Sequence, residues 1–175
     1  VEEGVFQAKE NKIIQNFIKL VNVTAKEIMT PNLVVASAPE SMTLREFYHN
    51  EQFNPYSRIP VYKENKNYIT GYVLRATVLE RLSEDKFNLS LSELARPILS
   101  FQEKESVSAI WEKMLENKEH ISIITDEYGC LRGIVTMEDV IETMLGVEIV
   151  DEYDTTTDMQ VLAREKWLKL KQRKK

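Results

Sequence analysis

The sequence is poor in cysteine, histidine and glycine, and it has no long apolar run. Its single cysteine, Cys130, excludes an intrachain disulfide and fits a reducing compartment. No apolar stretch approaches the roughly 20 residues that a membrane-spanning helix needs, and the first residues lack the basic start and apolar centre of a secretory signal. With two histidines and five glycines, the chain shows no Ser-His-Asp or Cys-His arrangement and no glycine-rich phosphate loop. We therefore expect a binding domain without catalytic residues.

The remaining composition is that of a soluble globular protein. The chain has 175 residues, of which 43% are hydrophobic and 29% are charged, enough for one core or two small ones. Residues 1–163 carry 16 Lys and Arg against 27 Asp and Glu, whereas residues 164–175 carry seven basic residues and one acid. The acidic body argues against a nucleic-acid surface. The basic end fits contact with anionic lipid head groups or a solvated helix end.

An internal repeat sets the expected architecture. Four signals recur in the same order, at offsets that fall from 66 residues to 62 along the chain. The paired segments are 27–31 with 94–97, 40–43 with 105–108, 57–62 with 119–124, and 71–74 with 133–136. Each half follows a β-α-β-β-α pattern of about 60 residues, which is too small to bury much surface alone. We therefore expect an α/β (α+β) fold in which two halves pack sheet to sheet around one core, with pseudo-two-fold symmetry.

Hydrophobic periodicity places the elements within each half. A turn is expected at 126–129, and Gly146 is expected to end a helix. Apolar stripes in 5–21 and 158–172 predict docking helices that flank the repeat. Strands are predicted at 33–36, 58–62, 68–74, 98–101, 120–125 and 131–136, and helices at 42–48, 75–82, 107–115 and 137–146.

The motifs that end and open the halves resemble those of a known family. Gly133–Asp139 reads Gly-apolar-apolar-Thr-x-x-Asp, and Ile28–Pro31 resembles a unit opening. Together they resemble a CBS-domain pair, or Bateman module, over roughly residues 2–154. Ser57–Tyr62 and Asp126–Gly129 resemble, more narrowly, the CorC/HlyC and CNNM branch. The resemblance divides the chain into a connecting helix from a membrane domain (1–23), two CBS motifs (24–87 and 88–150), and an acidic linker with a basic helix (151–175).

The resemblance implies a site for an adenine nucleotide, ATP or AMP, with or without Mg²⁺. A carboxylate such as that of Asp139 accepts hydrogen bonds from both ribose hydroxyls, while Thr136 opens a helix whose N–H groups favour an anion. Arg58 has the fork geometry that phosphates require. A second cleft around Leu74 and Thr77 lacks the acid, which predicts one site per chain. The implied nucleotide site comprises Thr30, Tyr56, Ser57, Arg58, Ile59, Pro60, Thr136 and Asp139.

Each of these features has a plainer interpretation. Thr136 and Asp139 have the spacing of a helix capping box, and Arg58 is able to pair with a nearby acid at a strand edge. His120, expected in the slot equivalent to Arg58, fits a strand histidine better than a metal ligand, because no partner stands at ligand spacing. Asp151, Glu152 and Asp154 fit a solvated linker or a cation site, but we expect no metal ligands.

The implied function is regulatory. A nucleotide would bias a membrane domain attached to this chain, which by resemblance transports Mg²⁺ or Co²⁺ from the cytoplasmic face of the cell membrane. The expected partners are the nucleotide, a second copy in a homodimer, and that membrane domain, with no nucleic acid. Two alternatives stay open: a dimerisation scaffold without ligand, and a lipid-surface adaptor acting through the basic end.

Overall fold

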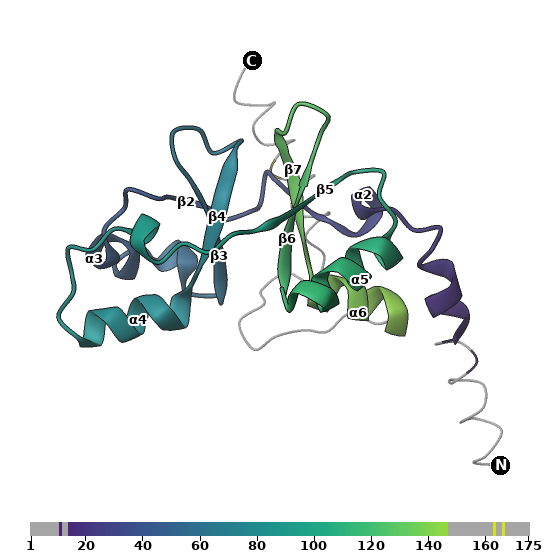
Figure 1. Ribbon diagram of the computed structural model, residues 1–175, viewed down its shortest axis with the longest axis horizontal. Helices are drawn as coiled ribbons and strands as arrows, with labels where there is room; N and C mark the ends of the chain where they lie inside the picture. Colours follow the sequence, from purple (N-terminus) through teal and green to yellow (C-terminus); the bar gives the residue numbers. More distant parts are fainter. Residues whose placement is uncertain (1–10, 12–13, 147–162, 164–165, 167–175) are drawn as a thin grey trace, which may run out of the picture.

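Two similar halves lie side by side in the molecule. The computed structural model describes residues 11, 14–146, 163 and 166. In Figure 1 the strands of both halves stand next to one another at the centre, with α3 and α4 on one side and α5 and α6 on the other. A three-stranded sheet has the order β2-β3-β4 and a four-stranded sheet the order β1-β7-β6-β5. Among the described helices, none has the length and apolar character to cross a bilayer.

The predicted β-α-β-β-α pattern is confirmed in both halves. The first half contains β2 (Ala38–Pro39), α3 (Leu44–Tyr48), β3 (Arg58–Tyr62), β4 (Ile69–Leu74) and α4 (Arg75–Ser83). The second contains β5 (Leu99–Gln102), α5 (Val107–Asn117), β6 (Ile121–Thr125), β7 (Leu131–Thr136) and α6 (Met137–Leu145). Gly146 ends α6 in the left-handed conformation, as its sequence position predicted. Two further elements, α2 (Ala25–Ile28) and β1 (Thr30–Pro31), open the first half ahead of this pattern.

The segment that opens each half crosses to the sheet of the other. Strand β1 pairs with β7, and Arg96 bridges to Tyr72 on β4. Both crossings depend on a glycine: a Cβ on Gly133 would lie 2.4 Å from the carbonyl oxygen of Thr30, and one on Gly71 would lie 2.4 Å from that of Arg96. The prediction of a strand at 33–36 is wrong, because that stretch is turn and coil and connects β1 in one sheet to β2 in the other.

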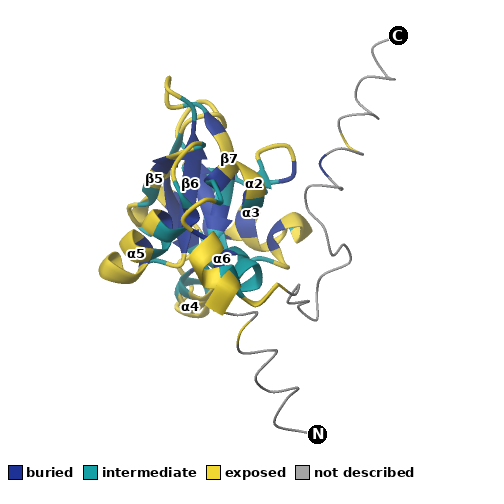
Figure 2. Cartoon of the chain, turned by 90° about the vertical axis from the view of Figure 1, so that its right-hand side faces the viewer, coloured by how far each residue is buried: buried dark blue, intermediate teal, exposed yellow. Residues whose placement is uncertain are grey.

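The molecule has two hydrophobic cores, so the expectation of a single shared core is wrong. Each core lies between one sheet and its own helices, and Figure 2 shows the buried residues of the second half concentrated on β5, β6 and β7. We call the segments that open each half and cross to the other sheet the exchanged segments. They and the residues next to them contribute to the core of the other half: Leu20, Ala25 and Met29 belong to the second core, and Leu91 belongs to the first. Burial of each large aliphatic side chain contributes about 1.5–3 kcal/mol.

The hairpins correct the alignment of the two halves. Arg58 lies opposite Leu74 in one hairpin, and Ile121 lies opposite Thr136 in the other. Because Leu74 and Thr136 are the equivalent ends of β4 and β7, Arg58 corresponds to Ile121. The expected match of Arg58 with His120 is therefore wrong by one residue. The first hairpin has a connection one residue longer than the second, which shifts the offset between halves.

The stripe predicted on segment 5–21 is exposed where the structure describes it. Residues 14–19 are helical, yet Ile14 and Ile18 are 58% and 64% exposed. Leu20 is the residue that docks, with 1% exposed, and the Asn16 amide donates to the Met144 carbonyl at the end of α6. In segment 158–172 the structure describes Ala163, which is buried, and Lys166, which is exposed. The acids Asp151, Glu152 and Asp154 lie outside the described residues.

Candidate functional site

The candidate site lies along the seam, which we define as the space between the facing surfaces of the two sheets. Ile59 and Val61 on β3 belong to the first core, so the alternate residues Arg58 and Pro60 face the seam. Tyr72, opposite Pro60 on β4, faces it as well. We call the end of the seam beside Thr136 and Asp139 the first cleft, and the equivalent end beside Leu74 and Thr77 the second cleft.

The β1 crossing brings residues of both halves to the first cleft. Thr30 lies opposite Ile134 in an antiparallel pair, two residues before Thr136 on β7. Because side chains alternate along a strand, Ile134 and Thr136 share a face with Thr30. The crossing is held further along by Asn32, whose amide donates to the Leu131 carbonyl. Two hydroxyls predicted for the site thus lie together at the start of α6.

Thr136 and Asp139 form a complete capping box at that helix start. The Thr136 N–H and hydroxyl donate to one Asp139 carboxylate oxygen, Oδ2, at 2.6 and 2.8 Å, and Asp139 N–H donates back to the Thr136 hydroxyl at 3.3 Å. The plainer interpretation of this tetrapeptide is therefore confirmed. It leaves the ligand interpretation open, because a carboxylate has a second oxygen and further lone pairs with which to accept bonds.

The protonation of Asp139 is strongly affected by its position. Burial raises its pKa to about 6, although the hydrogen bonds from Thr136 act to lower it. The described charges that act on it, Glu142 and Glu138, raise the pKa further. A carboxyl group held in this way is poised to gain from hydrogen-bond donors and positive charge supplied by a ligand or a bound cation.

Arg58 lies on the other wall of the seam. It is partly buried, and its charge acts, after that of Arg96, to lower the pKa of the Tyr72 phenol. Its charge is not among those that act on Asp139, and within the described residues its side chain makes no ion pair. The plainer interpretation, an ion pair at the strand edge, finds no support there. A nucleotide carries its phosphates several bonds from its ribose, so a site for it does not need its carboxylate and its guanidinium to touch.

The other predicted residues lead up to Arg58 or follow it. Tyr56 packs partly against the first core, and the Ser57 carbonyl accepts the N–H of Arg75 at 2.9 Å. The Ile59 side chain is fully buried in the first core, which leaves its main chain to face a ligand. Pro60 is buried on the seam face. The structure thus gathers Thr30, Thr136 and Asp139 and sets the 56–60 segment on the opposite sheet.

Two seam residues escaped the sequence analysis. The Tyr72 hydroxyl donates to a Glu119 carboxylate oxygen at 2.7 Å, joining the first half to the second. Tyr72 is 2% exposed. The two residues are 47 positions apart and belong to no motif. The available signal was the repeat itself, because Tyr72 stands where the second half has Ile134.

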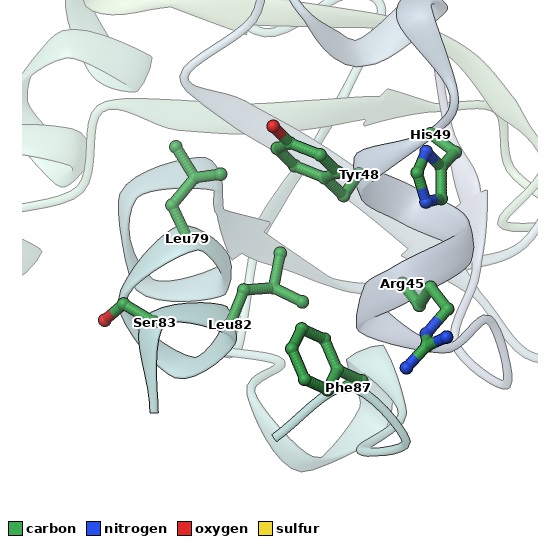
Figure 3. Close-up of a pocket in the computed structure, with 7 residues that line it drawn as sticks. All are labelled: Arg45, Tyr48, His49, Leu79, Leu82, Ser83 and Phe87. Carbon is green, nitrogen blue, oxygen red and sulfur yellow. The ribbon is translucent and has the colours of Figure 1, made fainter. Parts of the chain in front are cut away.

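A separate groove lies on the outer helices of the first half. It has a volume of about 510 Å³, and Figure 3 shows Tyr48, Leu79, Leu82 and Phe87 turned toward one another around it. Arg45 lies over the Phe87 ring, 4.8 Å from its centre. None of the predicted site residues lines this groove, and no carboxylate does. Its apolar, open surface suits a protein contact better than a ribose or a phosphate.

Comparison with known protein families gives a match over most of the chain. The model of the CBS domain matches residues 25–84 and 91–146. A UPF0053 protein of Synechocystis, sll1254, is 32% identical over 165 residues, which cover 94% of this chain and 47% of that protein. The magnesium and cobalt efflux protein CorC of Buchnera aphidicola is 27% identical over 161 residues, covering 89% of this chain and 55% of CorC. The chain thus spans about half the length of these curated relatives.

Solved structures give the same result. The CBS domain of a bacterial CNNM/CorC family Mg²⁺ transporter is 28% identical, with a TM-score of 0.79 over 86% of this chain and 91% of that one. A structure of such a domain in complex with ATP has a TM-score of 0.74 at 28% identity, over 79% of this chain and 98% of that one. A hemolysin-like protein containing a CBS domain, from Oenococcus oeni, is 26% identical with a TM-score of 0.69, over 75% and 97%.

Proposed function

The chain belongs to the CBS-domain family, and from this premise we propose that it is the nucleotide-sensing part of a larger membrane transporter. The first cleft binds an adenine nucleotide, ATP or AMP, with or without Mg²⁺. Binding biases an attached membrane domain that moves Mg²⁺ or Co²⁺. The protein acts as a binding module at the cytoplasmic face of the membrane, not as an enzyme.

One observation carries this proposal: a partly buried carboxylate stands at a helix start on the seam, and the opposite sheet carries a guanidinium that makes no ion pair with any described residue. Asp139 binds both ribose hydroxyls in charge-assisted hydrogen bonds, and Thr30 and Thr136 add hydroxyl partners at the same place. Arg58 binds the phosphates from the other sheet. The ATP complex of a CBS domain 28% identical to this chain supports the same class of ligand.

The regulatory step follows from the position of the site between the halves. A ligand that contacts both sheets stabilises the arrangement of halves that brings its two groups of partners together. It shifts the population toward that arrangement by the difference in affinity for the two states. The exchanged segments couple this shift to the chain that enters before residue 24, which is where we place the attached membrane domain.

Calorimetric titration tests the nucleotide site. We expect ATP, ADP and AMP, with and without Mg²⁺, to separate in affinity, and the preferred nucleotide to lose at least tenfold in the Asp139→Ala variant. Truncation removes the two ribose hydrogen bonds, and bonds to a charged group contribute about 1.5–3 kcal/mol. Glu112→Ala, an exposed acid on α5, is the matched control and retains affinity. Absence of binding by the unmodified chain would refute the proposal.

A dimerisation scaffold without ligand is the second candidate, favoured by exposed apolar side chains. Tyr48 and Leu79 line the outer groove at 56% and 37% exposed, and Phe17 on the leading helix is 53% exposed. Sedimentation equilibrium distinguishes the two functions. A ligand module loses nucleotide affinity in Asp139→Ala but keeps its mass in solution, whereas a scaffold has no affinity to lose and dissociates in Leu79→Lys.

A further inference from the structure

We propose that Tyr72 and Glu119 form a built-in plug, in which their hydrogen bond fills the second cleft and pins the two halves together. A nucleotide then has access to the first cleft alone. This inference rests on the proposed function for its ligand, but the plug itself is a property of the unliganded fold. The plug would explain why each chain has one nucleotide site, and it is a more specific explanation than the missing aspartate of the second cleft.

The two clefts differ at equivalent positions. With the corrected alignment, the His120 carbonyl accepts the N–H of Met137 just as the Ser57 carbonyl accepts that of Arg75. One position earlier, Glu119 therefore corresponds to Tyr56. On the neighbouring strands, Tyr72 corresponds to Ile134. The first cleft thus has Tyr56 and Ile134, where the second has a carboxylate and a phenol that bond to each other.

The phenol occupies the seam instead of solvent or either core. Tyr72 is 2% exposed but belongs to neither core cluster, which leaves the space between the sheets as the place where it is buried. Its backbone is fixed by two hydrogen bonds to Arg96, at 3.0 and 2.8 Å. A buried ring with a fixed backbone and a bonded hydroxyl has little freedom to move aside for a ligand.

The charges around the plug favour the closed form. Burial, followed by the bond to Glu119, raises the pKa of the Tyr72 phenol, so that it stays a donor across the physiological range. The charges of Arg96 and Arg58 act to lower the pKa of the same phenol, but burial and the bond to Glu119 outweigh them. In the second cleft the Glu119 carboxylate repels the phosphates of a nucleotide. In the first cleft the equivalent residue is a tyrosine, Tyr56, which has no such charge.

A double-mutant cycle tests whether the plug joins the halves. Tyr72→Phe removes the hydroxyl alone, and Glu119→Ala removes the acceptor. We expect each to lower the midpoint of chemical unfolding and the double variant to lose no more than the worse single one. Tyr62→Phe is the matched control, because the Tyr62 hydroxyl on the adjacent strand has no hydrogen-bond partner among the described residues. Fully additive losses would overturn the plug.

Stoichiometry tests whether the plug closes the second cleft. Leu74→Thr with Thr77→Asp restores the motif residues there, and we expect calorimetry to count one ATP per chain, as in the unmodified protein. Adding Tyr72→Ile and Glu119→Tyr, which copies the first cleft at these two positions and leaves the Arg96 guanidinium nearby for the phosphates, raises the count to two. A count of two without the last pair overturns the plug, as does a count of one with it when affinity at the first cleft is retained.

The two tests separate the inference from the proposed function. A chain that binds no ATP at all refutes the nucleotide site, while the double-mutant cycle still decides whether the plug exists. Where the fourfold variant fails to fold, as judged by its circular dichroism, the cycle alone decides. Coupling in the cycle supports the plug, and its absence overturns it.

Discussion

The proposed nucleotide site would give Asp139 a second role beside its capping box, and the two roles compete at the level of single atoms. Its Oδ2 accepts two hydrogen bonds from Thr136, so in the proposed site ribose recognition falls to the remaining lone pairs of the same carboxylate. The cap fixes the rotamer of the side chain before any ligand arrives, which lowers the entropy lost on binding. The structural and the ligand-binding interpretations of this residue are therefore compatible, because the first prepares the geometry that the second uses.

Replacing Asp139 with Asn separates charge from geometry. The amide oxygen still accepts the bonds from Thr136, but the side chain no longer titrates. Since burial raises the pKa of Asp139 from 3.8 to about 6, its contribution to stability is fully present below pH 3.8 and is lost as the pH rises through 6. We expect the unfolding free energy of the wild type, relative to Asp139→Asn, to fall by about 2–3 kcal/mol between pH 4 and pH 7.

Chemical unfolding at a series of pH values measures this difference. The Asn variant serves as its own control for all other titrating groups, since these are shared by both proteins. Parallel curves for the two proteins from pH 4 to pH 7 would show that Asp139 titrates normally. If Asp139 binds the ribose as proposed, nucleotide affinity changes in the opposite direction, because binding requires the ionised carboxylate. We then expect the affinity to fall about tenfold from pH 7 to pH 5.

At the scale of elements, the β1 crossing depends on Gly133. A Cβ there would lie 2.4 Å from the Thr30 carbonyl oxygen and 2.9 Å from the Met29 sulfur. The backbone oxygen has no freedom to retreat while β1 stays paired, so Gly133→Ala displaces the strand that carries Thr30. We expect a loss of about 2–3 kcal/mol in unfolding free energy, together with weaker nucleotide binding.

Thermal unfolding and calorimetry check this prediction against a neighbouring change. Arg132→Ala alters an exposed residue of the same strand, whose ion pair with Glu103 is half exposed and contributes little. It is expected to leave both stability and affinity nearly unchanged. Equal stability of Gly133→Ala and the wild type would contradict the prediction, because it would mean that β1 accommodates a methyl group at this position without loss of packing.

The elements show which parts of the fold are readable from sequence. Hairpins 58–74 and 121–136 and the helices after them were predicted because their signals are local: alternation, a turn at Asp126, a cap at Thr136. Strand β1 was missed because it is two residues long and pairs with β7, a hundred positions away. The predicted alignment of Arg58 with His120 was wrong by one residue, because hydrophobic periodicity does not show that the two hairpin loops differ in length.

The candidate site divides in the same way. Thr136 and Asp139 were proposed for the site because a short motif carries them, and Arg58 because its neighbours resemble a family segment. Tyr72 and Glu119 were missed because their contact crosses the seam. It depends on how the two sheets face each other, which no local pattern shows. The exchange of opening segments, which decides this, is set by tertiary packing around Gly71 and Gly133 and has no local signal.

At the scale of the molecule, the exchanged segments make the two cores dependent on each other. The second core is completed by Leu20, Ala25 and Met29, which lie in or just before the segment that opens the first half. The first core is completed by Leu91, in the segment that opens the second half. The halves are also joined by the Leu131 N–H, which donates to the Asn67 carbonyl at 2.7 Å. Damage to either core therefore loosens segments that the other requires.

This dependence predicts a single cooperative transition that a lesion in one half shifts for both. Trp111 packs against the second core, and Trp167→Phe makes it the sole tryptophan of the chain. In that background Leu44→Ala, a fully buried residue of the first core, costs about 2–5 kcal/mol. We expect the Trp111 fluorescence transition to move to lower denaturant by the same amount as the far-ultraviolet circular dichroism.

Leu115→Ala is the matched control for this experiment, since Leu115 is 48% exposed on α5, and it is expected to move neither transition by more than about 0.5 kcal/mol. A Trp111 transition that stays in place while the dichroism signal splits into two steps would contradict the prediction. The second half would then fold without the first, and a nucleotide in the seam would have no cooperative unit through which to act on a membrane domain.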